Sequence, residues 1–95
     1  MKVEIKPEFL KSALDQEKPV RKGIAKMLEV AEALDMAGLL AHQGVHLEKI
    51  NGWTLPDGTQ LYTLRATKAA RAVASIKGNT LVLHYVEPDH DKVYP

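Results

Sequence analysis

The sequence predicts an α+β fold in which a helical hairpin covers one face of a mainly antiparallel sheet. Apolar residues recur at spacings of three and four through the first 40 residues, which is the period of amphipathic helices. From residue 45 onward the period changes to two, which is the period of strands. Since the helices precede the strands in one block, the simplest packing is two layers, with the second face of the sheet free for function.

The first part of the chain is expected to form a short strand and two helices. The opening MKVEI alternates between apolar and polar residues, which predicts a strand. Pro7 and Glu8 suit a first helical turn, because proline is tolerated there and an acid favours the positive end of the helix dipole. Pro19 restarts the apolar pattern, so a longer helix should run to about Leu40. The short connection between the two helices predicts an antiparallel hairpin.

Three or four strands are expected in the remainder of the chain. Val45 and Leu47 alternate with polar residues and begin a strand that ends in NGW, after which PDG marks a turn. The runs LYTLRAT, ARAVASI and TLVLHYV have strand character, and the tripeptide KGN signals a hairpin between the last two. The 95 residues are enough for one core, so we expect a single domain over residues 1–95.

Composition excludes several classes of function. The chain has no cysteine, so disulfides, thiolate metal sites and cysteine nucleophiles are excluded. It shows no signal peptide and no run of ~20 apolar residues, which predicts a cytoplasmic protein without a membrane partner. The net charge of +1 does not by itself indicate a nucleic-acid binder. However, residues 41–86 carry five Lys/Arg against two Asp/Glu, so an anion-binding surface is expected in this part.

Two arginines on consecutive strands are candidates for binding phosphate. Arg65 and Arg71 lie among alanines and threonine, and such small neighbours leave room for guanidinium groups to meet a phosphate bidentately. Lys49, one strand earlier, could join them. Alternatively, both arginines cover the sheet edge or pair with Asp57 or Glu48, and Lys49 faces solvent.

The C-terminal segment PDHDKVYP supplies a candidate for proton transfer. The aspartates beside His90 favour its charged imidazolium form, which suits acid–base chemistry. If the segment returns along the sheet, His90 and Tyr94 would face the arginines; otherwise His90 is an exposed tail residue and Tyr94 closes the core. His84 lies in an apolar strand and is expected to be structural. His42 and His46 have no obvious third ligand, so no metal site is expected.

Taken together, these features resemble the RelE/ParE toxin superfamily of bacterial toxin-antitoxin modules over essentially the whole chain. The resemblance rests on the order of elements, on Leu64-Arg65 followed by Arg71-Ala72-Val73, and on the terminal His90-Asp91-Lys92-Val93-Tyr94. It implies a RelE/ParE-like fold, an antitoxin partner and one of two activities. The first is ribosome-dependent cleavage of messenger RNA without a metal or other cofactor. The second is binding alone, either to DNA gyrase or as a docking module on a protein or nucleic acid.

The resemblance also implies roles for individual residues. His90 would be the general acid or base, Arg65 and Arg71 the electrostatic clamp, and Tyr94 an orienting or stacking group. Further phosphate-binding or proton-transfer groups would be His46, Lys49 and Lys68. The chain departs from RelE itself, since Leu61, Thr63 and Pro88 stand where RelE has basic catalytic residues. His90 and Tyr94 instead fit the spacing of a subgroup that uses histidines.

Overall fold

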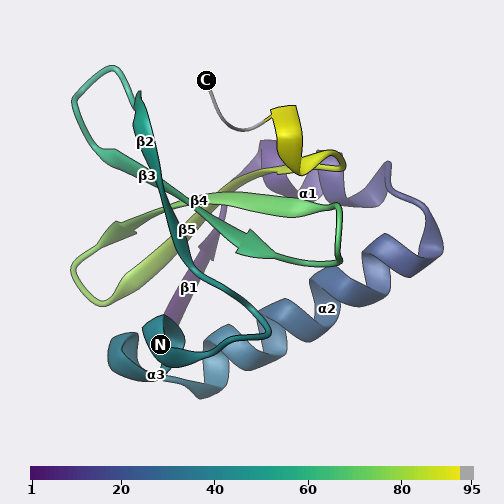
Figure 1. Cartoon of the computed structure of the whole chain (residues 1–95), viewed down its shortest axis with the longest axis horizontal. Helices are drawn as coiled ribbons and strands as arrows, with labels where there is room; N and C mark the ends of the chain where they lie inside the picture. Colours follow the sequence, from purple (N-terminus) through teal and green to yellow (C-terminus); the bar gives the residue numbers. More distant parts are fainter. Residues whose placement is uncertain (93–95) are drawn as a thin grey trace.

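The structure, a computed structural model, describes residues 1–92 and has the predicted α+β class (Figure 1). The described elements, in chain order, are β1 (Lys2–Ile5), α1 (Pro7–Leu14), α2 (Lys18–Ala33), α3 (Met36–Ala41), β2 (Glu48–Thr54), β3 (Gln60–Arg65), β4 (Arg71–Lys77), β5 (Thr80–Glu87) and the 3-10 helix η1 (His90–Lys92). The predicted order of a strand, helices and then a run of strands is therefore confirmed.

All five strands belong to one sheet, in the order β1-β5-β4-β3-β2. The pairs β2–β3, β3–β4 and β4–β5 are antiparallel, as expected for strands joined by short connections. The N-terminal strand β1 pairs in parallel with β5, so that Lys2 lies opposite Thr80 and Ile5 opposite Leu83. The sheet thus brings the beginning of the described chain next to its last strand.

The helices cover one face of the sheet, which gives the expected two layers (Figure 1). Phe9 of α1, Met27 of α2 and Leu39 of α3 are each at most 2% exposed. They belong to one apolar cluster with buried residues of the three central strands: Leu64, Ala72, Ala74, Leu81, Leu83 and Val86. Burial of this apolar surface is the main force that holds the two layers together.

Helix α2 lies close to the β3–β4 connection (residues 66–70) at Gly23. A Cβ atom added at this glycine would collide with the carbonyl oxygen of Ala66 and would lie 2.8 Å from Cγ2 of Thr67. A glycine is therefore needed for the helix to lie directly against this connection, which also carries part of the candidate site.

The expected single helix to Leu40 is wrong. Helix α2 ends at Ala33, and the backbone of Leu34 is extended. Asp35 then starts α3, because its side-chain oxygen accepts a hydrogen bond of 2.8 Å from the N–H of Gly38.

Among residues 1–92, no helix is both long enough and apolar enough to cross a lipid bilayer.

The expected strand start at Val45 is also wrong, since β2 begins at Glu48. His46 has a positive φ of 48°, which is incompatible with a strand. Val45 is nevertheless 3% exposed, and its carbonyl accepts a hydrogen bond from the N–H of Arg65. The alternating pattern here reflects burial of a turn against β3 and the helices.

Candidate functional site

The sheet face opposite the helices, here called the open face, carries a small apolar cluster of its own. Ile50, Leu61 and Val73 are buried there, and Leu55 and Tyr85 pack against them. Residues that pair across antiparallel strands share a face, so each row of pairs on this face can be followed from strand to strand.

One row on the open face contains two arginines and a glutamate. Arg65 of β3 pairs with Arg71 of β4, which pairs with Glu87 of β5. The next row, Thr63, Val73 and Tyr85, includes the buried cluster residue Val73. The predicted proximity of the two arginines is therefore present at the end of β3 and the start of β4.

The Arg71 side chain holds the backbone of the connection between β3 and β4 in place. Its Nη1 atom donates hydrogen bonds of 2.9, 3.0 and 3.2 Å to the carbonyl oxygens of Thr67, Lys68 and Ala70. The residue is only 7% exposed. Part of its guanidinium is thus engaged in holding the local backbone, and its role as a phosphate clamp stays a prediction.

Arg65 has a different environment, although it is the direct cross-strand neighbour of Arg71. It is exposed, and its backbone N–H is bonded to the carbonyl of Val45. Within residues 1–92 its guanidinium makes no hydrogen bond or ion pair. Arg65 is therefore the arginine of the pair whose charge is available to a ligand.

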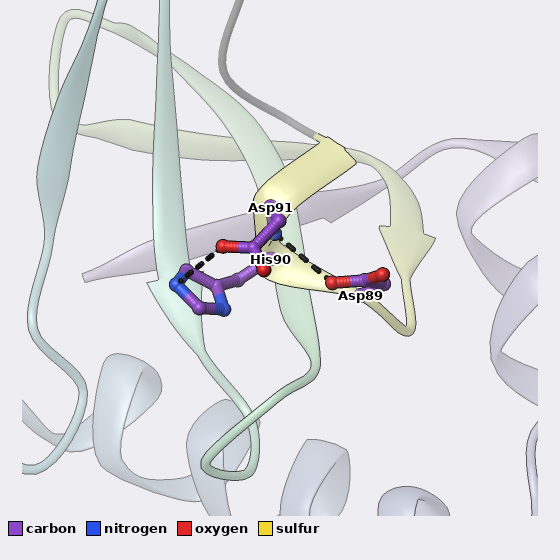
Figure 2. Close-up of side chains that lie close together, drawn as sticks. All are labelled: Asp89, His90 and Asp91. Carbon is purple, nitrogen blue, oxygen red and sulfur yellow. Dashed lines mark hydrogen bonds and ion pairs between the residues drawn. The ribbon is translucent and has the colours of Figure 1, made fainter.

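The segment after β5 returns to the β3–β4 connection. The backbone N–H of His90 donates a 2.8 Å hydrogen bond to the carbonyl oxygen of Ala69. The His90 side chain is 42% exposed, and its Nε2 atom lies 3.2 Å from Oδ1 of Asp91 (Figure 2). His90 is thus held beside the five-residue connection between β3 and β4. The same connection binds the Arg71 guanidinium and contains Lys68.

Asp89, His90 and Asp91 lie close together, with potential metal-ligand atoms within 4.8 Å of one another. Two of these atoms have local partners: Asp89 Oδ1 accepts a 3.1 Å hydrogen bond from the backbone N–H of Asp91, and Asp91 Oδ1 lies 3.2 Å from Nε2 of His90 (Figure 2). We interpret the cluster as the polar cap of η1.

The remaining predicted site residues are dispersed. Lys49 pairs with Tyr62, which pairs with Ala74 of the helix-side core, so Lys49 lies on the face opposite the arginine row. His46 forms an exposed ion pair of 3.1 Å with Glu48. Tyr94 lies outside the described residues. Functional roles for these three residues stay predictions.

The open face also holds two adjoining cavities, of about 730 and 460 Å³, that share His84, Lys6 and Leu55. His84 lies at an irregularity in the β4–β5 pairing, and its Nε2 atom is 2.8 Å from Oγ of Ser75. Burial, and then the positive charge of Lys6, lower the pKa of His84, while Glu4 acts in the opposite direction. The sequence predicted that His84 is structural. It gave no sign that His84 lines a cavity.

Comparisons with known proteins agree with this architecture. No protein-family model and no curated protein matches the sequence. Among solved structures, the chain is similar to one from the crystal structure of the RelB-RelE antitoxin-toxin complex of Methanococcus jannaschii, at 16% identity and a TM-score of 0.67. That match covers 95% of this chain and 93% of the other.

A second similar structure is that of a copper-bound mutant toxin from Helicobacter pylori. It has a TM-score of 0.57 at 13% identity, over 99% of both chains. The described chain is therefore an α+β protein with an open sheet covered by helices on one side. More particularly, its fold is that of the RelE-like toxins.

Proposed function

We propose that the protein is a RelE-like toxin that inhibits translation by cleaving messenger RNA on the ribosome without a metal ion. The observation that carries this proposal is the hydrogen bond from the His90 N–H to the Ala69 carbonyl. It anchors a half-exposed histidine at the connection that follows Arg65 and precedes Arg71. A titratable group and cations on neighbouring backbone are what phosphodiester cleavage requires.

In this reaction the ribose 2′-oxygen forms a bond to phosphorus, and the bond from phosphorus to the 5′-oxygen breaks. His90 would take the proton from the 2′-hydroxyl or give one to the leaving oxygen. Arg65, whose guanidinium has no partner among residues 1–92, would stabilise the extra negative charge on the phosphorane, assisted by Arg71 and Lys68. Tyr94 would orient or stack on a base.

An antitoxin is the partner that we propose for the open face. The similar structure from Methanococcus jannaschii is that of an antitoxin-toxin complex. The open face of this chain has an apolar cluster and two adjoining cavities, which suit a segment that folds as it binds. Such a segment would cover the approach to His90.

A binding-only function is the second candidate, with DNA gyrase or another macromolecule as target. Two observations favour it: the Nη1 atom of Arg71 is engaged with three carbonyls, and Glu87 adds a negative charge to the arginine row. Both reduce the positive potential that RNA would meet.

The test is tightly controlled induction in cells, with growth and primer extension on a reporter transcript measured together. Wild type is compared with His90→Ala and with the matched control Lys92→Ala, an exposed residue of the same short helix. The nuclease proposal expects arrest and cuts within codons for wild type and Lys92→Ala but not for His90→Ala. Arrest without cuts would support the binding-only function. Unimpaired growth in the presence of folded wild-type protein would contradict both the nuclease and the binding-only function.

A further inference from the structure

The first half of helix α2 carries four exposed cations. Residues 18–26, KPVRKGIAK, contain four Lys/Arg and no Asp/Glu. These four exposed residues are here called the basic ridge: Lys18, Arg21, Lys22 and Lys26. The rest of the chain has nine Lys/Arg against twelve Asp/Glu, which is a net charge of −3. The protein therefore has a local excess of positive charge on this helix, although its total charge is only +1.

The cations of the basic ridge are regularly spaced. Lys18, Lys22 and Lys26 follow one another at intervals of four residues, so they lie on the same side of the helix. A rise of ~1.5 Å per residue places successive lysines ~6 Å apart along the helix axis. Arg21 flanks this row, whereas Met27 of the same helix is buried in the core. The ridge is thus an ordered row of charges on the solvent side of α2.

This row of charges is unfavourable for the helix itself. Like charges four residues apart repel each other, and a cation in the first turn, such as Lys18, faces the positive end of the helix dipole. Acidic partners do not compensate, because among residues 1–92 the side chains of Lys18, Arg21 and Lys22 make no hydrogen bond or ion pair.

Lys26 has a 3.9 Å ion pair with Glu29, but both side chains are more than 70% exposed, so this pair contributes little. The fold therefore does not require the four charges, and a bound polyanion would offset their repulsion.

The basic ridge adjoins the connection between β3 and β4 (Figure 1). Gly23, the residue after Lys22, lies directly against the backbone of Ala66 in this connection. The same connection contains the exposed Lys68, and its backbone is bonded to the N–H of His90. Positive charge on α2 is therefore continuous, through Lys68, with the candidate site.

The composition of the ridge favours a nucleic acid over a protein as its partner. The other exposed residues of the segment 18–26 are Pro19 and Ala25. The centre of a protein–protein interface usually depends on aromatic or large apolar side chains, whereas interfaces with nucleic acids are polar and positively charged. An evenly spaced row of cations also matches the repeated charge of a phosphodiester chain.

We propose that the basic ridge binds the phosphodiester backbone of a single-stranded RNA, a neighbouring part of which reaches the candidate site. The choice of RNA rests on the proposed nuclease function, whereas the anionic character of the ligand rests on the ridge alone. Contacts to phosphate position a strand without reading its bases, so binding at the ridge should not depend on the RNA sequence.

The first experiment measures binding of a fluorescent single-stranded RNA by anisotropy at several salt concentrations. All 2′-hydroxyls of this RNA are methylated, so the 2′-oxygen cannot attack the phosphate and binding is measured without cleavage. Lys22→Gln should weaken binding by about fivefold at ~0.1 M salt, and should reduce the slope of log K against log salt by ~0.7, which is the value for one phosphate contact of a single strand.

Lys77→Gln is the matched control. Lys77 is an exposed lysine at the end of β4, in the hairpin on the opposite side of the molecule from the first half of α2 (Figure 1). Its replacement removes the same charge and should leave the affinity and the salt slope unchanged, because charges at this distance are screened. An equal loss in the control, or no loss for Lys22→Gln, would overturn the proposal. Competition by polyglutamate as strong as that by unlabelled RNA would overturn RNA as the partner.

Thermal unfolding tests whether the ridge serves binding or folding. The triple variant with Lys18→Gln, Lys22→Gln and Lys26→Gln should melt roughly 2–5 °C higher than wild type at low salt, because repulsion is relieved and glutamine has a helix propensity similar to that of lysine. The difference should shrink at ~1 M salt, where the charges are screened. A lower melting temperature would show that the lysines support the fold and would overturn the proposal.

These outcomes are separate from those of the proposed nuclease activity. Binding of the methylated RNA that depends on the ridge, by a protein that makes no cuts in cells, would support the ridge and contradict the nuclease function. Absence of binding that depends on the ridge would overturn the inference, whether or not cuts are observed.

Discussion

His84 of β5 and Ser75 of β4 are joined across the open face by a hydrogen bond of 2.8 Å between Nε2 and Oγ. Ser75 is only 5% exposed, whereas His84 reaches two adjoining cavities. The hydroxyl therefore has its partner within the sheet, and the imidazole is the group of the pair that responds to solvent and pH.

This pair predicts a loss of stability in acid. The pKa of His84 is lowered from its ordinary value of 6.5, so below that value the unfolded chain takes up a proton that the folded chain resists. The stabilising contribution is full above pH 6.5 and is lost as pH falls. Urea denaturation at about pH 8 and about pH 5 should show a larger loss for wild type than for His84→Gln. Equal losses would contradict this interpretation.

The two neighbouring arginines should differ in their effect on stability. Arg71→Ala removes three hydrogen bonds from a residue that is 7% exposed and should reduce the free energy of unfolding by about 2–3 kcal/mol. Arg65→Ala, its matched control, should change it by less than ~0.5 kcal/mol, because the side chain is exposed and unpartnered within residues 1–92. Denaturant titration measures both. Indistinguishable losses would show that Arg71 does not stabilise the β3–β4 connection.

Gly23→Ala should be destabilising, against the usual preference for alanine in helices. Helix propensity alone would give a gain of about 1 kcal/mol. The new methyl group would instead collide with the backbone oxygen of Ala66, which cannot rotate away. We expect a net loss of about 1–2 kcal/mol by thermal or chemical denaturation. Lys22→Ala, at the preceding exposed position of α2, should be nearly neutral, and a gain in stability for Gly23→Ala would contradict the close approach.

Ser12→Ala tests how α1 is attached to β5. The Oγ atom of Ser12 accepts a 2.8 Å hydrogen bond from the N–H of Val86 and lies 2.8 Å from the carbonyl oxygen of Glu8. Removing the hydroxyl leaves the Val86 amide without this partner and should cost about 1–2 kcal/mol. Ser12→Thr retains the hydroxyl and should cost less. Amide hydrogen exchange at Val86 should accelerate in Ser12→Ala only; unchanged exchange would refute the role of this bond.

Local periodicity was sufficient to predict most elements. The run ARAVASI became most of β4 and TLVLHYV became most of β5. Both runs are rich in apolar residues, because one face of β4 packs on the helices and its other face on the open-face cluster. The break between α2 and α3 was missed because Leu34, Ala37 and Leu40 continue a spacing of three across it. Asp35 followed three residues later by Gly38 was the available signal of a new helix start.

The candidate site was less predictable, because it depends on contacts between distant segments. The sequence left open whether His90 returns toward the arginines or lies in an exposed tail, and its backbone is bonded to Ala69 of the β3–β4 connection. No local pattern shows that the Arg71 guanidinium folds back on its own connection.

The pairing of β1 with β5 affects how the protein is made. Among the described strands, β1 leaves the ribosome before β2, β3 and β4, and its partner β5 follows all of them, since Lys2 lies opposite Thr80. Contacts between such distant residues must close a long loop, so they form late and slowly. Before β5 emerges, the nascent chain lacks both the partner of β1 and the strand that carries His84 and leads to His90. We therefore expect copies that are truncated before β5 to be unfolded, because β1 has no partner in them.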